Sequence, residues 1–537
     1  MVEKPSRRYC ILILLLSISF IVSFRPRVGR AADEGDPPER KAPVVVAYTR
    51  YQWWLIRWVD NQVLCSIFTD QEGLPTGDDI FADCGRTIYN IWAATPACTS
   101  NAEQCAGVYL HLVSKEPAEK TVLVDLPPAQ VFLSLENCPY PTSSNLCDRL
   151  PSLVFTGQEP IPDEEIIAIR GFINGEPFSC TGSECEIPLR PTRMEGVFVD
   201  FWADSSFGDS SSVFQAKVRV VESGVSADPA SRGWYVDVLS SQWNGKPAPI
   251  CAQIWNTFPP IGEAPSWLDT PPVPEFLATQ NPYYYLAGRL IAQGMVNAGT
   301  CPAGGLLPNG YANECGLEIA LPEVNLWQNQ FDPQILEIAN QVNIPAHLLK
   351  NLFAQESQFW PGAFKDPKEF GLGQLTDSGA ETILLWDTRF FHQFCPTMLE
   401  ASTCQRGYVY LSKENQQILR GALAIQVRAD CADCTAGINL ENVKSSINLF
   451  AYTLVANCAQ VSRLIYNATN RTPEQVQVRY EDLWRFTAAN YHVGPGCLSY
   501  AVYSAWARGE PLEWERVSAF LTSVCLGVIE YIDNVTQ

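Results

Sequence analysis

One glutamate lies on the face of an expected helix that is otherwise apolar. The spacing predicts a helix with Asn343 as its cap and Pro345 at its first position, followed by AHLLKNLFAQES. Its apolar stripe consists of Leu348, Leu349, Leu352 and Phe353. Glu356 follows on the same face, where burial disfavours the charged form of a carboxyl group and suits it to act as a general acid. Periodicity alone favours the plainer interpretation, in which Glu356 turns into solvent at the helix end.

Short sequence blocks follow this glutamate along the chain. Residues 356–374 read ESQFWPGAFKDPKEFGLGQ, residues 490–496 read NYHVGPG, and Tyr531-Ile532 lies near the C-terminus. In order and spacing these blocks resemble the lytic transglycosylase (SLT) domain family of the lysozyme-like superfamily, with its catalytic Glu-Ser, its Gly-Leu-Met-Gln and its Ala-Tyr-Asn-Ala-Gly-Pro-Gly. The resemblance covers about residues 331–537. It rests on Glu356, Ser357, Gly371, Gly373, Gln374, Tyr491, His492 and Tyr531.

The resemblance implies a helical lysozyme-like domain that cleaves the β-1,4 bond between N-acetylmuramic acid and N-acetylglucosamine in peptidoglycan, without a cofactor or a metal. Glu356 would be the single acid/base: it would protonate the glycosidic oxygen and then accept the proton of the muramyl 6-hydroxyl as this closes on C1. The product is a 1,6-anhydromuramyl end, so one carboxyl group suffices where most glycosidases use two. Ser357 and Gln374 would bind the sugar or the transition state, and Tyr491 would position Glu356. The other implied substrate-binding residues are Gly371, Gly373, His492 and Tyr531.

The sequence departs from the family pattern within two blocks. Gly373 replaces the family's Met, which removes a bulky wall of the sugar groove, and His492 replaces its Asn. The chain between Gln374 and Tyr491 is also longer than compact members need. We expect the excess around residues 388–437, as a disulfide-stapled loop on the groove.

Two other functions stay open from the sequence. A hydrolytic muramidase on the same fold needs a second carboxylate to activate water. Asp366, Glu369, Asp377 and Asp387 all lie near Glu356 in sequence. A non-catalytic wall-binding or envelope-structural protein with a degenerate site would also account for Gly373 and His492.

The composition argues against nucleic-acid binding and favours an oxidising compartment. Lys and Arg number 37 against 58 Asp and Glu, a formal net charge of −21, whereas nucleic acid requires a basic footprint. The 19 cysteines beside only four histidines indicate disulfides rather than zinc. The expected partner is the peptidoglycan glycan strand, and the β-rich modules are candidates for contacts with other envelope components.

The chain is expected to divide into an export signal, β-rich modules and a helical domain. A basic start, the 15-residue apolar run from Cys10 to Phe24 and small residues after it predict a secretory signal peptide over residues 1–32. The protein is therefore expected to be exported to the extracellular space or cell envelope, with an uncleaved membrane anchor as the alternative. The expected fold class is multidomain, with N-terminal β-rich modules before an all-α lysozyme-like catalytic domain. The expected segments are a linker at 33–42, a β-rich module at 43–128, a β-sandwich-like module at 129–222, a connector with a disulfide loop at 223–330 and the lysozyme-like domain at 331–537.

The cysteines after Cys10 number 18, which suits complete pairing. Proximity along the chain predicts the pairs Cys65–Cys84, Cys98–Cys105, Cys138–Cys147, Cys180–Cys185, Cys301–Cys315, Cys395–Cys404, Cys431–Cys434 and Cys497–Cys525. Eleven of the 18 precede residue 331 and seven follow it, so at least one pair must join the two parts. We expect that pair to be Cys251–Cys458.

Overall fold

The computed structural model describes most of the chain after the predicted signal peptide. The described residues are 39–98, 105–138, 146–224, 233–245, 248–262, 264–362 and 369–537. The predicted signal peptide, with Cys10, and most of the predicted linker lie outside them. The described chain forms two compact units that meet in sequence at Leu126 and Pro127.

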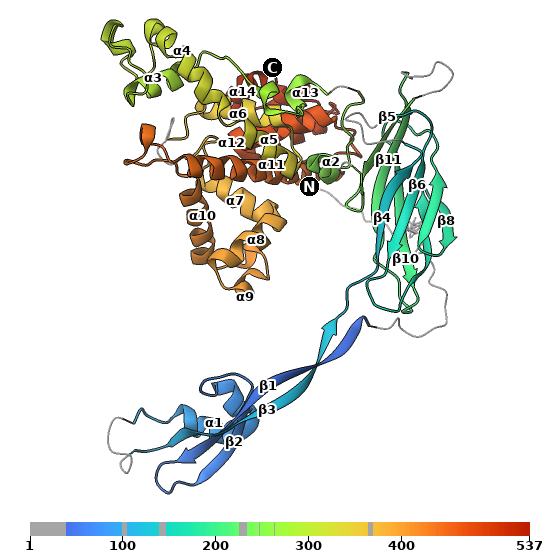
Figure 1. The fold of residues 1–537 in the computed structure, drawn as a ribbon, viewed down its shortest axis with the longest axis vertical. Helices are drawn as coiled ribbons and strands as arrows, with labels where there is room; N and C mark the ends of the chain where they lie inside the picture. The colour runs from blue at the N-terminus through green and yellow to red at the C-terminus, as the bar shows by residue number, and fades with distance from the viewer. Residues whose placement is uncertain are drawn as a thin grey trace, which may run out of the picture. The chain divides into compact units, whose positions relative to one another are not determined.

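The smaller unit consists of three antiparallel strands and one helix (Figure 1). Its elements are β1 (Lys41–Arg57), β2 (Val63–Thr69), α1 (Gly77–Ala93) and β3 (Val108–Asp125), with the strand order β2-β1-β3. The sequence predicts separate strands at Val44–Tyr48 and Gln52–Val59, and again at Gly107–Val113 and Thr121–Asp125, whereas the structure has one long strand in place of each pair. The reason is that β1 and β3 pair with each other over their full lengths. The buried core of this smaller unit contains Trp53, Leu55, Ile67, Ile80 and Val108.

The larger unit begins with a sandwich of two antiparallel sheets. The strands are β4 (Gln130–Glu136), β5 (Leu146–Cys147), β6 (Ser152–Gln158), β7 (Ile166–Ile173), β8 (Glu176–Thr181), β9 (Glu184–Pro188), β10 (Val197–Ser205), β11 (Phe214–Glu222) and β12 (Trp234–Leu239). One sheet has the order β5-β12-β11-β10-β7-β8 and the other β4-β6-β9. Phe155 of the small sheet contacts Phe178 and Phe201 of the large one, with ring centroids 4.9 and 5.3 Å apart. Because β12 belongs to this sandwich, the module extends past residue 222, where the sequence placed its end.

Helices make up the remainder of the larger unit (Figure 1). They are α2 (Ile250–Trp255), α3 (Tyr284–Ala292), α4 (Glu314–Asn329), α5 (Asp332–Val342), α6 (Ala346–Ser357), α7 (Asp377–Trp386), α8 (Thr388–Met398), α9 (Ala401–Cys404), α10 (Lys413–Val427), α11 (Leu440–Thr469), α12 (Tyr480–Ala507), α13 (Trp514–Val517) and α14 (Gly527–Val535). Short 3₁₀ turns lie at Ser266–Leu268, Pro274–Leu277, Pro302–Gly305, Tyr408–Tyr410, Thr435–Gly437, Ser518–Phe520 and Ser523–Cys525.

The later part of the segment expected to be a connector, from α2 onward, belongs to the helical core, whereas β12 belongs to the sandwich. One cluster of buried apolar side chains runs from Leu239 to Val535 and includes residues of α2, α3 and α4. Trp255 of α2 donates its Nε1 hydrogen to the carbonyl of Cys458 in α11, at 2.8 Å. The helical region therefore begins well before residue 331, because its long central helix needs apolar partners from this segment as well.

Helices α7 to α10 have a smaller core of their own. Its buried residues include Ile383, Phe391, Leu419 and Leu423, and the Cys395–Cys404 disulfide joins α8 to α9. The extra segment was expected to be a stapled loop, but the structure folds it as helices. Apolar residues recur at helical spacing in this segment, and α8 and α10 each bury one apolar face.

The cysteines form the pairs expected from the sequence. Nine disulfides are present among the described residues: Cys65–Cys84, Cys98–Cys105, Cys138–Cys147, Cys180–Cys185, Cys251–Cys458, Cys301–Cys315, Cys395–Cys404, Cys431–Cys434 and Cys497–Cys525. Eight are local, whereas Cys251–Cys458 spans 207 residues and joins α2 to α11. So many disulfides indicate an oxidising environment.

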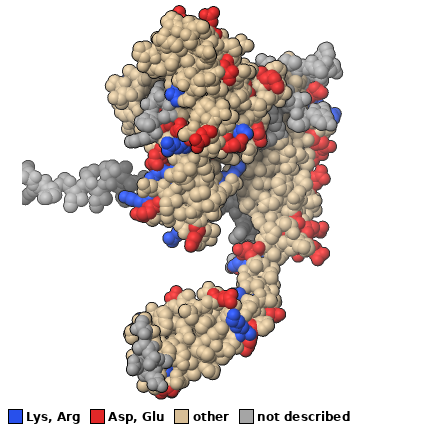
Figure 2. Space-filling model, turned by 60° about the vertical axis from the view of Figure 1, so that its left-hand side comes forward, with Lys and Arg blue, Asp and Glu red and all other residues tan. Residues whose placement is uncertain are grey.

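The surface reflects the acidic composition. Figure 2 shows Asp and Glu side chains spread over the visible face, with Lys and Arg among them rather than gathered into a broad basic patch. Within the described part of the chain, no helix is both long enough and apolar enough to cross a membrane.

Candidate active site

Glu356 lies in the last turn of α6. All four residues of the predicted apolar stripe are buried, but the predicted cap is wrong. Asn343 instead ends α5 in the left-handed conformation (φ 58°), and α6 begins at Ala346 after Pro345. Gln358 and Phe359 also adopt positive φ angles, of 48° and 61°. They end α6 abruptly and leave Glu356 half-buried beside the turn.

Tyr531 of α14 is the direct hydrogen-bond partner of this glutamate. Its phenol donates to Glu356 Oε1 at 2.5 Å, a short distance typical of bonds to a charged acceptor. The ring of Tyr531 is buried. Burial, together with the nearby Glu356 carboxylate, raises the pKa of Tyr531 well above the ordinary value for a phenol. The sequence assigned the positioning of Glu356 to Tyr491, but the direct contact in the structure is made by Tyr531.

Tyr491 lies close by and links α12 to the Gly371–Gln374 block. Its phenol donates to the carbonyl of Gly373, and its ring packs edge-on against Phe450 of α11. Burial raises the pKa of Tyr491 well above its usual range, and the charges of Glu356 and Glu369 raise it further. Both carboxylates therefore act on this phenol.

His492 lies at the surface of the same cluster. Its imidazole stacks on the Tyr531 ring, with centroids 4.0 Å apart and planes 14° from parallel. Gly494, with φ 78°, interrupts α12 just after it, and Pro495 starts the second half of that helix. The glycine and proline of this block thus end a helical segment where Tyr491 and His492 lie beside Tyr531.

Ser357 and Gln374 do not lie where a sugar could touch them. Ser357 is fully buried and donates to the carbonyl of Leu372 at 2.7 Å. Gln374 is 4% exposed, and its Nε2 donates to the carbonyls of Gly371 and Gly362 at 2.7 and 3.2 Å. The sequence predicted both as ligands of substrate. In the structure they hold the turn after α6 against the Gly371–Gln374 block.

The two glycines of that block are required by close packing against α11. A Cβ atom on Gly371, whose φ is 74°, would come within 2.6 Å of Ser446 Cβ. A Cβ atom on Gly373 would overlap the Phe450 ring. Phe450 thus occupies the space next to position 373, where the family has Met. Sequence reasoning missed Ser446 and Phe450, because nothing local marks which face of α11 meets this block.

The structure distinguishes three of the four candidate second carboxylates. Asp377 pairs with Arg420 at 3.1 Å, and Asp387 accepts the Phe390 N–H at the start of α8 at 2.9 Å. Asp366 lies outside the described residues. Glu369 is the one whose charge acts on the cluster, through Tyr491.

The cluster therefore consists of a half-buried carboxyl group, one buried and one half-buried tyrosine, and an exposed imidazole. Such a set can exchange one proton with a bound molecule and orient the carboxyl group while it does so. Within the described residues, no group of three or more His, Cys, Asp and Glu side chains is arranged to hold a metal ion. No protein-family model and no curated protein matches this chain.

Proposed function

We propose that this protein is an exported peptidoglycan lytic transglycosylase in which Glu356 is the acid/base. The observation that carries the proposal is the hydrogen bond from Tyr531 to Glu356 Oε1 beside Tyr491 and His492. Three sequence blocks that are far apart in the chain supply these residues, and they are the blocks that resemble the SLT domain. The nine disulfides support an oxidising compartment.

In the proposed reaction one carboxyl group serves twice. Glu356 gives its proton to the oxygen between N-acetylmuramic acid and N-acetylglucosamine, and the bond from that oxygen to C1 breaks. The carboxylate then takes the proton of the muramyl 6-hydroxyl, whose oxygen forms a bond to C1. Glu356 ends protonated as it began, and no water is used. The phenol of Tyr531 holds the carboxyl group in place throughout.

Isotope labelling tests the proposal. The full-length protein is incubated with purified peptidoglycan in ¹⁸O-labelled water, and the products are analysed by mass spectrometry. We expect 1,6-anhydromuramyl ends without ¹⁸O, and a rate at least about 100-fold lower for Glu356→Gln. Glu530→Gln, an exposed carboxylate on α14 next to Tyr531, is the matched control and should keep the wild-type rate. An unchanged rate in Glu356→Gln would refute the proposal.

A hydrolytic muramidase is the second candidate, because Glu369 acts electrostatically on Tyr491. A second carboxylate near the acid is what activation of water requires. In that case the new ends are reducing, each carries one ¹⁸O atom, and Glu369→Gln lowers the rate. If the wild-type protein releases no products yet sediments with peptidoglycan, the protein is a wall-binding protein instead.

A further inference from the structure

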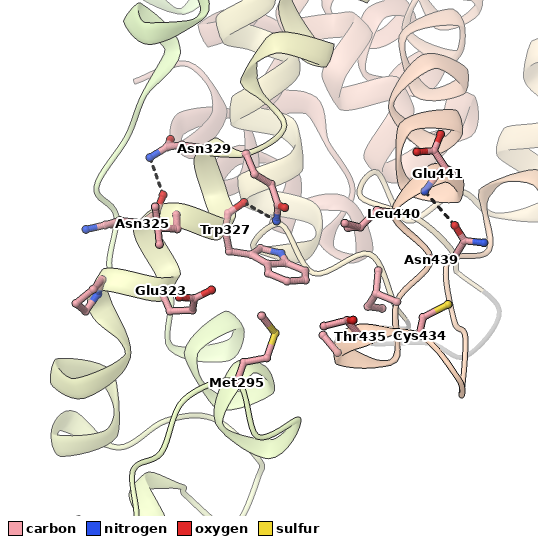
Figure 3. A pocket seen from close by; sticks show the side chains of 15 residues that line it. Met295, Glu323, Asn325, Trp327, Asn329, Cys434, Thr435, Asn439, Leu440 and Glu441 are labelled. Carbon is pink, nitrogen blue, oxygen red and sulfur yellow. Dashed lines mark hydrogen bonds between the residues drawn. The ribbon is translucent and has the colours of Figure 1, made fainter.

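The helical region has a large cavity that shares no residue with the Glu356 cluster. Its volume is about 940 Å³, within the range of pockets that bind small molecules. One side is formed by α4 and Met295, and the other by the segment from Cys434 to Glu441 at the start of α11 (Figure 3).

The last two turns of α4 form one side of the cavity. Glu323, Leu326, Trp327 and Gln330 recur at the spacing of a helical stripe and all line the cavity. Leu326 is 67% exposed although it is large and apolar. Figure 3 shows Glu323, Trp327 and Met295 on the α4 side of the cavity, across from Thr435 and Cys434.

The opposite side is held by a disulfide. Cys431–Cys434 closes a tight turn, and the Cys431 N–H donates to the carbonyl of Gly437 at 2.9 Å. This turn carries Thr435 to the cavity, and Leu440, 45% exposed, follows it. The cavity therefore has two walls that keep their shape without a ligand.

A stack of rings connects the cavity to the turn that follows Glu356. Trp327 donates its Nε1 hydrogen to the carbonyl of Phe359 at 2.9 Å. Trp327 also stacks on Trp360, with centroids 5.7 Å apart, and the Arg289 guanidinium lies over Trp360 at 4.9 Å. Trp327 thus joins the lining of the cavity to the turn that follows α6.

The lining chemistry identifies the class of ligand. Exposed apolar side chains are mixed with the amides of Asn325, Gln330 and Asn439, and none of the lining residues is Lys, Arg or His. Asn329 also lines the cavity, but its amide is bonded to Thr279, Asn325 and Lys350, and Asn439 Oδ1 caps α11. Of the two lining carboxylates, Glu441 is paired with Lys444 Nζ at 2.9 Å, so the demand for a cationic ligand is small. Amides and carboxylates around apolar surface suit the hydroxyl and acetamido groups of an uncharged sugar, with its C–H faces on Leu326 and Leu440.

We propose that this cavity binds N-acetylated glucosamine units of a glycan strand, as a subsite apart from the Glu356 cluster. The inference rests on the proposed function, because it takes the strand to be the substrate. In addition, contacts of the strand with α4 and with the Cys431–Cys434 turn would contribute to its binding free energy. Long strands should therefore be cleaved with a lower KM than short ones.

The test uses tetra-N-acetylchitotetraose and the full-length Glu356→Gln variant, which removes turnover. Affinity is measured by calorimetry, and contact is mapped by hydrogen exchange of residues 322–330 and 434–441. We expect protection of both segments. The pair Leu326→Ala and Leu440→Ala should weaken binding at least about 10-fold, as expected for losing buried apolar contact. Ile319→Ala and Glu318→Gln on exposed parts of α4 are matched controls, and they should stay within about 2-fold of the parent.

Two results would overturn the inference. One is chitotetraose binding that neither protects the two segments nor responds to the leucine changes, which leaves the proposed function intact. The other is preferential binding of the peptide acetyl-Ala-Lys-Ala-amide that is lost in the Glu323→Gln, Glu441→Gln pair, which would make the cavity a peptide site. If the wild-type protein has no catalytic activity but chitotetraose binds as expected, the result counts against the proposed function alone.

Discussion

At the scale of single residues, the candidate site depends on the packing of Phe450 beside Gly373. Phe450 occupies the volume next to Gly373 and packs against Tyr491. Its ring centroid lies 5.0 Å from that of Phe353 in α6. The absence of a bulky residue at position 373 is thus matched by a bulky residue on α11.

Gly373→Met should destabilise the fold through overlap with Phe450. We expect a loss of about 1–3 kcal/mol in the free energy of unfolding, as for other overpacked cores. Combining it with Phe450→Ala should cost less than the sum of the two single changes, because the Met side chain can occupy the space that the Phe450 ring leaves. Urea denaturation of the four proteins measures this coupling, and strictly additive losses would show that the two positions are independent.

Tyr531 should make stability depend on pH in the alkaline range. Its pKa is raised in the folded protein, whereas a free phenol has a pKa of about 10. Its contribution is therefore complete below pH 10 and is lost as pH rises towards the folded pKa, at up to about 1.4 kcal/mol per pH unit. Tyr531→Phe should reduce this slope in denaturation curves recorded from pH 8 to 11. Tyr500→Phe, at an exposed position of α12, should leave the slope unchanged.

At the scale of elements, the orientation of α6 depends on a buried ion pair. Lys350 Nζ lies 2.7 Å from Asp332 Oδ1 in α5, and it also donates to the carbonyl of Leu277 and to Asn329 Oδ1. Burial lowers the pKa of Lys350 and raises that of Asp332. Every donor on the ammonium group has a protein partner, which is the condition for burying such a charge.

Lys350→Met should cost about 3–5 kcal/mol of unfolding free energy, because it leaves the Asp332 carboxylate buried without its partner. Adding Asp332→Asn should restore part of the loss by removing the charge itself. Lys444→Met serves as the control, since Lys444 pairs with Glu441 at the surface. Thermal and urea unfolding measure all three. Equal losses for the single and double variants would exclude this explanation.

At the scale of the whole chain, the larger unit is held together across its sequence. Lys217 of β11 pairs with Glu474 at 3.1 Å and donates to the carbonyl of Asn256, which joins the sandwich to the helices. Cys251–Cys458 joins α2 to α11. The module expected to be a connector thus contributes to the core that supports α6.

Replacing Cys251 and Cys458 by Ala should lower the unfolding free energy by about 2–5 kcal/mol, because the longest closed loop is lost. The matched control replaces Cys180 and Cys185, which close a loop of only five residues, and should cost less. Calorimetry of both variants gives the comparison. A larger loss in the control would contradict the role of loop length.

Local features could be predicted well. The apolar stripe of α6, the sandwich-like module and eight of the nine cysteine pairs follow from residues close together in sequence, whereas Cys251–Cys458 spans 207 residues. Errors arose where an end or a partner depends on something distant. Asn343 was expected to begin α6 but instead ends α5. Strands β1 and β3 are longer than expected because they pair with each other.

By itself, then, the sequence determined the oxidised, acidic character of this protein, its order of β-rich and helical parts, and the position of Glu356 on a buried helix face. Those properties depend on composition and on helical spacing over a few turns. Only the tertiary structure decided that Tyr531 contacts Glu356, that Ser357 and Gln374 are buried, that Phe450 faces Gly373 and that a cavity lies beside α4. These depend on side chains from helices far apart in the chain, and which faces meet is set by the packing of the whole core.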